Sequence, residues 1–280
     1  YNGPIVDAPG SYSGTSSYMG RANAFFTVLP YWKSFYESNA DGSQKDVRRD
    51  VNFVDYAYVW NATTETQDKS YTASSIAKSL YRYPGKWRRE WMALGFVDPN
   101  HTGVNYCPLR YADVVLMAAE AYNETNNTTE AWKLLNDVRQ RAEATPITSA
   151  NYASLMKAPK VYNLDFIDDS DDAGKFRTAL YWERGFELCY EGQRKYDFLR
   201  WGCLGDALRA AQAYIESWYP DANEYINAST LQSWDPVSWA SSNYVAGHNF
   251  VDGKHELYPI PLAEIQSNAA LNGQNNPGFE

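Results

Sequence analysis

The chain has 280 residues and a mass of 31.8 kDa, which is enough material for one large hydrophobic core or two small ones. Its formal net charge of -9 and pI near 4.9 argue against binding to nucleic acid, whose phosphates require clustered Lys and Arg. The same acidic balance disfavours direct contact with an anionic membrane and favours a neutral ligand such as a glycan.

Residues 1–105 are expected to be irregular, because Gly, Ser, Asn and Asp interrupt short aromatic runs and only residues 74–80 indicate a helical turn or two. The whole chain has 23 Tyr and 10 Trp, more than a core of this size needs, so some rings should face solvent. An exposed ring beside amide, carboxylate or guanidinium groups suits a sugar, which has both apolar and hydroxylated surfaces. The predicted ligand-binding residues are Tyr18, Asn23, Tyr31, Trp32, Asp55, Tyr58 and Trp60. Any single ring could instead belong to the core, so the hypothesis concerns the set.

Residues 109–142 have the pattern of two helices joined by a short turn. Pro108 suits a first helical turn, Asn126 and Asn127 make the turn, and Asn127 is expected to cap the second helix with Glu130 as its capping-box partner. The unit has roughly the 34-residue length of a tetratricopeptide repeat. Such repeats bury their faces by stacking, so either a preceding segment supplies further repeats or a helix at 176–191 and the aromatic loops cover the exposed face. The second must hold at least in part if this chain folds by itself.

Residues 176–191 are predicted to form a helix whose apolar face includes Trp182 and Phe186 and which Gly192 ends. Glu183, Glu187 and Glu191 stand four residues apart and would repel one another. We expect Arg184, Arg194 and Arg200 to neutralise them, because a guanidinium can bridge two carboxylates. This interleaving favours structural ion pairs over the isolated, desolvated carboxyl group of an acid catalyst. A further helix is expected over 205–219.

The search for chemistry is mostly negative. The three histidines form no His-Glu-x-x-His array, and neither a Gly-x-Ser-x-Gly elbow nor a glycine-rich phosphate loop is present in the sequence. Cys107, Cys189 and Cys203 lack metal-like spacing and are expected to be buried thiols, with at most one disulfide. Calcium is conceivable at the acidic run 165–172, but the EF-hand spacing fails at Ala173 and a solvated loop is favoured. No cofactor and no metal site are predicted.

Residues 182–202 resemble the signature of the SusD/RagB family, surface lipoproteins of Bacteroidetes that bind nutrients for a TonB-dependent transporter. The residues that match this signature, read as scaffold, are Glu183, Arg184, Glu187, Glu191, Arg194, Asp197 and Arg200. Residues 109–142 are similar to the family's helical hairpin, and 257–265 with 274–279 to its C-terminal end. Residues 46–49 look like a degenerate form of a family Asp-Pro-Arg turn.

The resemblance implies a mainly α, SusD-like fold: a TPR-type helical hairpin plus further helices with long, irregular, aromatic-rich loops. We expect one C-terminal domain over residues 1–280, loop-rich over 1–105 and a helical scaffold with its tail over 106–280. Because the chain opens on Tyr1, a preceding segment is expected to carry the signal, the lipidated cysteine and the first repeats.

The function that the resemblance implies is non-catalytic binding of glycans at the cell surface, for delivery to a SusC-like TonB-dependent transporter in the outer membrane. Membrane attachment would be only through the lipid anchor. Two alternatives stay open: peptide binding by the same fold, as on the RagB side of the family, and a glycoside hydrolase that uses two of the carboxylates.

Overall fold

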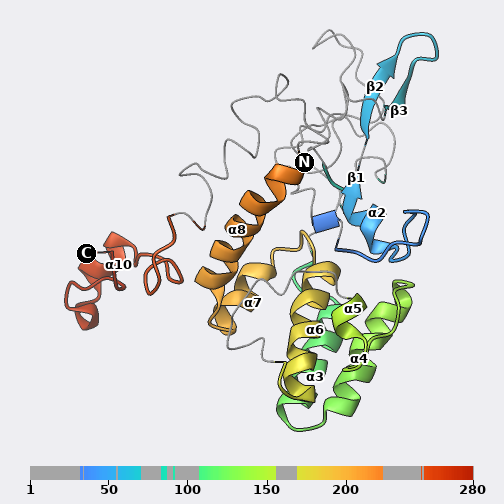
Figure 1. Ribbon diagram of the computed structural model, residues 1–280. Helices are drawn as coiled ribbons and strands as arrows, with labels where there is room; N and C mark the ends of the chain where they lie inside the picture. Colours follow the sequence, from blue (N-terminus) through green and yellow to red (C-terminus); the bar gives the residue numbers. More distant parts are fainter. Residues whose placement is uncertain are drawn as a thin grey trace. The chain divides into compact units, whose positions relative to one another are not determined.

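The computed structural model describes residues 32–33, 35–54, 56–70, 83–86, 91, 107–155, 169–222, 247 and 249–279 (Figure 1). The chain falls into two compact units. The first comprises Tyr1–Pro159, Ile167–Arg194 and Glu224–Thr230, and the second Lys160–Phe166, Lys195–Asn223 and Leu231–Glu280. The expectation of a single domain stays a prediction.

A helical hairpin and a third helix form the body of the first unit. Helix α3 covers Tyr111–Glu124, α4 covers Thr128–Arg141 and α6 covers Asp172–Glu187, and α6 packs against both helices of the hairpin (Figure 1). The short helix α5, Tyr152–Leu155, follows the hairpin. The predicted mainly helical fold with a hairpin packed on the later helix is therefore confirmed.

Caps set the ends of these helices. The Asn127 side chain accepts a hydrogen bond from the Glu130 backbone N–H at 3.4 Å, as expected, but the Glu130 carboxylate accepts from Lys133 instead of completing a capping box. Helix α3 begins two residues later than predicted, because its N-cap is Arg110 and Pro108 lies outside it. The Asp171 side chain caps α6 by accepting from the Gly174 N–H at 2.7 Å.

The core of this body consists of apolar side chains that the three helices bury together. Its fully buried members include Leu116, Ala119, Leu135, Phe176 and Leu180. The rings of Trp132 and Phe176 meet edge to face with centroids 5.1 Å apart. Burial of this kind, rather than helix propensity, supplies most of the stability of helices of this length.

Helix α6 ends earlier than the sequence pattern predicts. Its last residue is Glu187 and Leu188 is its C-cap, so Cys189 and Glu191 lie in a turn beyond it. Tyr190 and Gly192 in that turn have φ of 63° and 79°, which lie in the left-handed region. The apolar spacing continues through the turn, and for this reason periodicity alone overestimates the helix.

The earlier part of the first unit contains short strands that the sequence reading missed. After helix α2, Arg48–Asn52, strand β1, Phe53–Val54, pairs antiparallel with β4, Tyr83–Pro84. Strands β2, Ala57–Asn61, and β3, Thr66–Ser70, form a separate hairpin in which Asn61 pairs with Thr66. The run Tyr-Val-Trp in β2 has high strand propensity, but a single short run is weak evidence beside the surrounding polar residues.

The second unit contains most of α7, Arg194–Arg200, together with α8, Leu204–Ala222, and the C-terminal segment. The helix predicted over 205–219 is thus confirmed with longer bounds. In the C-terminal segment, α10 covers Leu262–Ser267 and a 3-10 helix, η3, covers Ala269–Leu271. Within the described residues, no helix combines the length and the apolar character that crossing a bilayer requires.

Two asparagines hold the C-terminal segment in shape. The Asn275 side-chain oxygen accepts from the Ile260 N–H, and the Asn276 side-chain amide donates to the Tyr258 carbonyl, both at 2.7 Å. The Asn-Asn-Pro sequence near the end of the chain therefore fixes the Tyr-Pro-Ile-Pro sequence before α10.

Candidate functional site: a buried arginine and glutamate network

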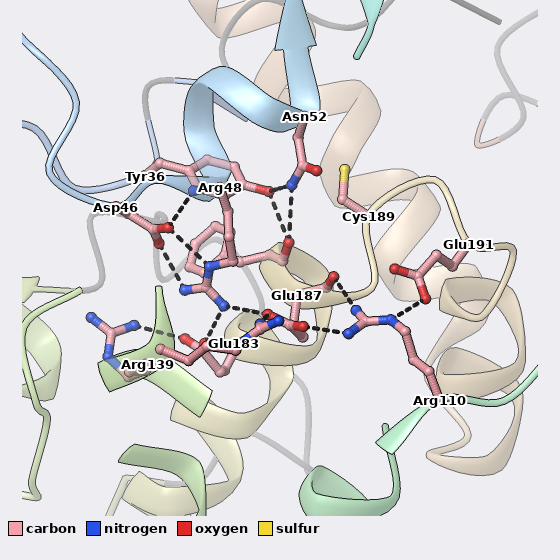
Figure 2. Close-up of polar contacts among 12 residues, drawn as sticks. Tyr36, Asp46, Arg48, Asn52, Arg110, Arg139, Glu183, Glu187, Cys189 and Glu191 are labelled. Atoms are coloured by element: carbon pink, nitrogen blue, oxygen red, sulfur yellow. Dashed lines mark hydrogen bonds and ion pairs between the residues drawn. The ribbon is translucent and has the colours of Figure 1, made fainter. Parts of the chain in front are cut away.

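Two carboxylates on the last turns of α6 are removed from water. Glu183 and Glu187 are 0% and 2% exposed. An ionised carboxylate at such depth costs several kcal/mol unless cations and hydrogen bonds compensate it. The residues that supply this compensation come from widely separated parts of the sequence, and Figure 2 shows their arrangement.

Arg48 is the central cation of the network (Figure 2). Its Nη1 donates to Glu183 Oε1 at 2.5 Å and to Glu187 Oε2 at 3.1 Å. On its other side, Nε and Nη2 donate to the two oxygens of Asp46 at 2.9 and 2.7 Å. Burial alone would lower the pKa of Arg48, but the Glu183 and Asp46 carboxylates outweigh it and raise the pKa well above its ordinary value. The segment that resembles an Asp-Pro-Arg turn thus presents this arginine to α6.

Arg139 of α4 holds the other side of Glu183. Its Nη1 donates to Glu183 Oε2 at 2.7 Å, its Nη2 donates to the Glu37 carboxylate, and its Nε donates to the Thr145 carbonyl at 2.8 Å. Glu183 therefore lies between guanidinium groups from α2 and α4. This joins α6 both to the hairpin and to the segment before it.

Arg110 closes the network at the end of α6. Its Nη1 donates to Glu187 Oε1 and its Nε to Glu191 Oε2, both at 2.6 Å. The Lys86 ammonium group forms an ion pair with Glu191 and donates to the Glu187 carbonyl at 2.8 Å. Arg110 donates to the same carbonyl at 2.7 Å, so cations occupy the negative end of the helix.

The cations around Glu187 keep it ionised. Arg141 Nη2 adds a further bond to Glu187 Oε2 at 2.5 Å. Burial alone would raise the pKa of Glu187, but Arg48 and Arg110 outweigh it and lower the pKa from its ordinary 4.5 to about 2. This carboxylate is therefore an ion-pair acceptor at neutral pH and lacks the raised pKa of a general acid.

Tyr36 and Asn52 extend the network to the backbone of α6 (Figure 2). Both side chains donate to the Phe186 carbonyl, Tyr36 at 3.1 Å and Asn52 at 3.2 Å, and Asn52 also donates to the Tyr36 hydroxyl at 3.0 Å. Burial raises the pKa of Tyr36 well above its ordinary value. The last carbonyls of a helix have no hydrogen-bond donor within the helix. In α6 the Phe186 and Glu187 carbonyls instead accept from side chains earlier in the chain, those of Tyr36, Asn52, Lys86 and Arg110.

The prediction that Arg184, Arg194 and Arg200 neutralise the three glutamates is wrong. Arg184 Nη1 donates to Asp113 of α3 at 2.7 Å. Arg194 Nη1 donates to the Tyr181 carbonyl at 2.6 Å, and its guanidinium lies 4.2 Å from the Tyr181 ring centroid. Arg200 pairs with Asp197 at 3.2 Å. These arginines are near the glutamates in sequence, but their side chains point in other directions from the helix or turn that carries them. Closeness in sequence therefore did not identify the true partners.

A pocket of about 220 Å³ adjoins the network. Its lining includes the charged residues Arg48, Lys86, Arg110, Arg141 and Glu187. Each of these cations bonds to a network carboxylate or to an α6 carbonyl, so the charge of the pocket walls is largely neutralised internally. The arrangement supports a rigid scaffold rather than proton transfer.

The predicted ligand-binding residues that the structure describes do not share one environment. Trp32 packs against Trp182 and Phe186, with ring centroids 5.9 and 5.6 Å apart. The side chain of Tyr58 is 4% exposed and meets the Tyr56 ring edge to face, whereas Trp60 on β2 is half-buried. The predictions for Tyr18, Asn23, Tyr31 and Asp55 lie outside the described residues. The set as a ligand site stays a prediction.

The cysteines and the acidic run differ in part from expectation. All three thiols are free, but only Cys203 is fully buried, and Cys107 is exposed, contrary to the prediction. Burial raises the pKa of the Cys189 thiol from 9.0 to about 11.

In the acidic run, Asp169 accepts from the Thr178 hydroxyl at 2.7 Å. No group of three or more potential metal ligands occurs within the described part of the chain.

Sequence reasoning missed several members of the network. These are Tyr36, Glu37, Asn52, Lys86, Arg110, Arg139 and Arg141. A signal was available, since buried acids on α6 require cations and Arg139 falls on the buried stripe of the second hairpin helix. The choice among the many arginines of the chain depended on tertiary structure.

Known proteins resemble this chain over most of its length. The model of the SusD family matches residues 27–279. One SusD-like protein of Formosa agariphila is 31% identical over 172 residues, covering 61% of this chain and 24% of that protein. Another from the same bacterium is 30% identical over 247 residues, covering 85% of this chain and 38% of that protein.

Solved structures agree with these relatives. A SusD homolog from Bacteroides thetaiotaomicron has a TM-score of 0.54 and 27% identity, covering 84% of this chain and 41% of that one. A SusD superfamily protein from Bacteroides vulgatus shares the fold, with a TM-score of 0.52 and 20% identity over 90% of this chain and 44% of that one. The chain spans less than half the length of each of these proteins. The match over residues 27–279 shows that the chain belongs to the SusD family.

Proposed function

We propose that this chain is part of a protein that binds oligosaccharides or polysaccharides as nutrients at the bacterial surface. The observation that carries the proposal is the family match over residues 27–279, since SusD-like proteins generally bind carbohydrate nutrients. The acidic charge supports an uncharged ligand rather than nucleic acid, and the abundance of Tyr and Trp supports a sugar.

We infer that binding occurs without turnover. In a glycosidase, one carboxyl group must hold a proton at working pH, and the usual means are burial and the absence of nearby cations. Glu183 and Glu187 are close neighbours on α6, but each accepts from at least two arginines. Glu183 and Glu187 are the pair of carboxylates that most resembles a glycosidase site, and these ion pairs support a structural role for both.

The proposal extends to location and partner. We propose that the full-length protein is attached to the outer membrane through a lipid anchor and delivers its ligand to a SusC-like TonB-dependent transporter. The family relationship supports both statements. Co-purification of the transporter from detergent-solubilised outer membranes of the native bacterium would test the partner, and recovery of the protein without any such transporter would count against it.

Calorimetric titration of the purified chain with soluble neutral oligosaccharides tests the ligand class. Heat of binding to at least one sugar, with no change in the sugar on chromatography after long incubation, is the expected result. New reducing ends would establish a hydrolase. Binding to a matched panel of peptides with no response to sugars would transfer the function to the peptide branch of the family.

A further inference from the structure

A second pocket lies on the helical hairpin, between the start of α3 and the end of α4. Its volume is about 290 Å³. The buried Val138 of α4 and the half-buried Ala112 and Val115 of α3 supply an apolar lining. These residues belong to packed helices, so the shape of the pocket is fixed before any ligand arrives.

Tyr111 stands at the edge of this pocket with its ring in solvent. Its side chain is 81% exposed, the largest value for any large hydrophobic residue in the described part of the chain. The Tyr111 hydroxyl makes no hydrogen bond to any described residue. An exposed ring next to an apolar hollow offers a flat surface that neither the core nor the ion network uses.

Three charged residues line the same pocket: Arg110, Arg141 and Asp137. Arg110 is held by its ion pairs with Glu187 and Glu191. Arg141 has a side chain 57% exposed and donates through Nη2 to Glu187 at 2.5 Å. A guanidinium group carries five N–H donors, so others remain available while the bond to the buried Glu187 fixes the direction of the side chain. The exposed carboxylate of Asp137 makes no hydrogen bond to a described residue and can accept from a ligand.

We propose that this hairpin pocket is a sugar-binding subsite, an assignment that rests on the proposed function. The Tyr111 ring packs on the apolar face of one sugar ring, Arg141 donates to its hydroxyl oxygens, and Asp137 accepts from its hydroxyl groups. A hydroxyl both donates and accepts, which a pocket with guanidinium donors and one exposed carboxylate can satisfy. Arg110 and Arg141 already pair with buried glutamates, and Asp137 adds an exposed negative charge, so the pocket favours an uncharged sugar over a uronic acid or a sulfated one.

A protein partner is the competing occupant, because Val114 and Met117 continue an exposed apolar strip along α3. The polar pair argues for the sugar. A helix packed on α3 would cover Arg141 and Asp137, and each would then need a partner of opposite charge in register. The hydroxyl groups of a sugar can hydrogen-bond to both Arg141 and Asp137 without any charged group placed opposite them. The experiment below separates the two occupants.

The test compares the full chain with Tyr111→Ala, Asp137→Asn and the control Tyr122→Ala. Tyr122 lies on the same helix and is 42% exposed but does not line the pocket. Each protein is titrated calorimetrically with linear hexasaccharides of glucose, xylose and mannose. We expect Tyr111→Ala and Asp137→Asn each to weaken binding by about tenfold or more, and Tyr122→Ala to bind like the parent. Equal thermal midpoints would show that all variants fold.

The possible failures have different meanings. If the parent binds a hexasaccharide and Tyr111→Ala binds it equally well, the subsite is refuted while the proposed function stands. If the parent binds none of the sugars, the proposed function fails and the subsite fails with it. Light scattering on the same samples covers the protein partner: a dimer of the parent that becomes a monomer in Tyr111→Ala would assign the face to protein contact and overturn the proposal.

Discussion

Arg48 Nη1 lies 2.5 Å from Glu183 Oε1, although 135 residues separate the two in sequence. The bond joins the short helix α2 to the last turns of α6, and both side chains are removed from water. The polar residues that most resemble a functional site are therefore the ones that hold the first unit together.

Replacing Arg48 by Ala should be strongly destabilising. The change leaves the buried carboxylates of Asp46, Glu183 and Glu187 with one cation fewer, so we expect the free energy of unfolding to fall by about 3–5 kcal/mol. Urea unfolding followed by circular dichroism measures it. Arg209→Ala removes an arginine from exposed pairs with Asp206 and Asp252 and should cost only ~0–1 kcal/mol. Similar losses in the two variants would contradict the central role of Arg48.

Stability should decrease in acid through Glu187. Its pKa is about 2 in the folded chain and near its ordinary 4.5 when unfolded, so the unfolded chain binds more protons between these values. The contribution is complete above about pH 4.5 and is lost as the pH falls toward 2. Urea midpoints at a series of pH values should show a shallower acid decline in Glu187→Gln than in the parent.

Glu130→Gln is the matched control for that series. Glu130 pairs with Lys133 at 2.8 Å on the solvent side of α4, and its side chain is 34% exposed. We expect its acid profile to follow the parent. If Glu187→Gln also follows the parent, the depressed pKa of Glu187 is not a source of the acid sensitivity.

The three cysteines should differ in reactivity. Cys107 is exposed, whereas Cys203 is buried and the pKa of Cys189 is raised to about 11, so little thiolate forms there at neutral pH. An aromatic disulfide reagent should modify about one thiol in the native chain and about three in urea. Cys107→Ser should remove the native reaction. Rapid labelling of that variant would show that Cys189 or Cys203 is accessible.

The C-terminal segment should loosen when its asparagine clamp is removed. Asn275→Ala deletes the acceptor for the Ile260 N–H and should cost about 1 kcal/mol locally. Hydrogen exchange at the Ile260 amide should accelerate. The neighbouring exposed Gln274 offers a control, because its side chain makes no hydrogen bond to a described residue. Gln274→Ala should leave the Ile260 amide exchanging as slowly as in the parent.

Much of the helical scaffold could be predicted from the sequence, because its signals are local. The 3.6-residue periodicity around Leu116 and Leu135 reports burial, and Asn127 marks a helix start through its own side chain. The end of α6 was misplaced because Cys189 and Tyr190 keep the apolar spacing after the backbone turns.

The ion network could be predicted only in part. The spacing of Glu183 and Glu187 showed that cations were needed, but a requirement for positive charge does not select among arginines. Arg48 and Arg110 are chosen by the fold, which brings residues far apart in sequence to the end of one helix. The role of Tyr111 was equally invisible, because an exposed and a buried tyrosine look alike at the start of a predicted helix.

The order of the network along the chain has a consequence for biosynthesis. Arg48, Lys86, Arg110 and Arg139 all precede α6. The ribosome therefore adds these cations to the chain before Glu183, Glu187 and Glu191 have been made. Until α6 is made, Arg48 and Arg139 have only the earlier partners Asp46 and Glu37. Lys86 and Arg110 still lack the glutamates that they contact in the folded chain. The long-range ion pairs to Glu183 and Glu187 can therefore form only after α6 has been made, when earlier residues can contact its glutamates.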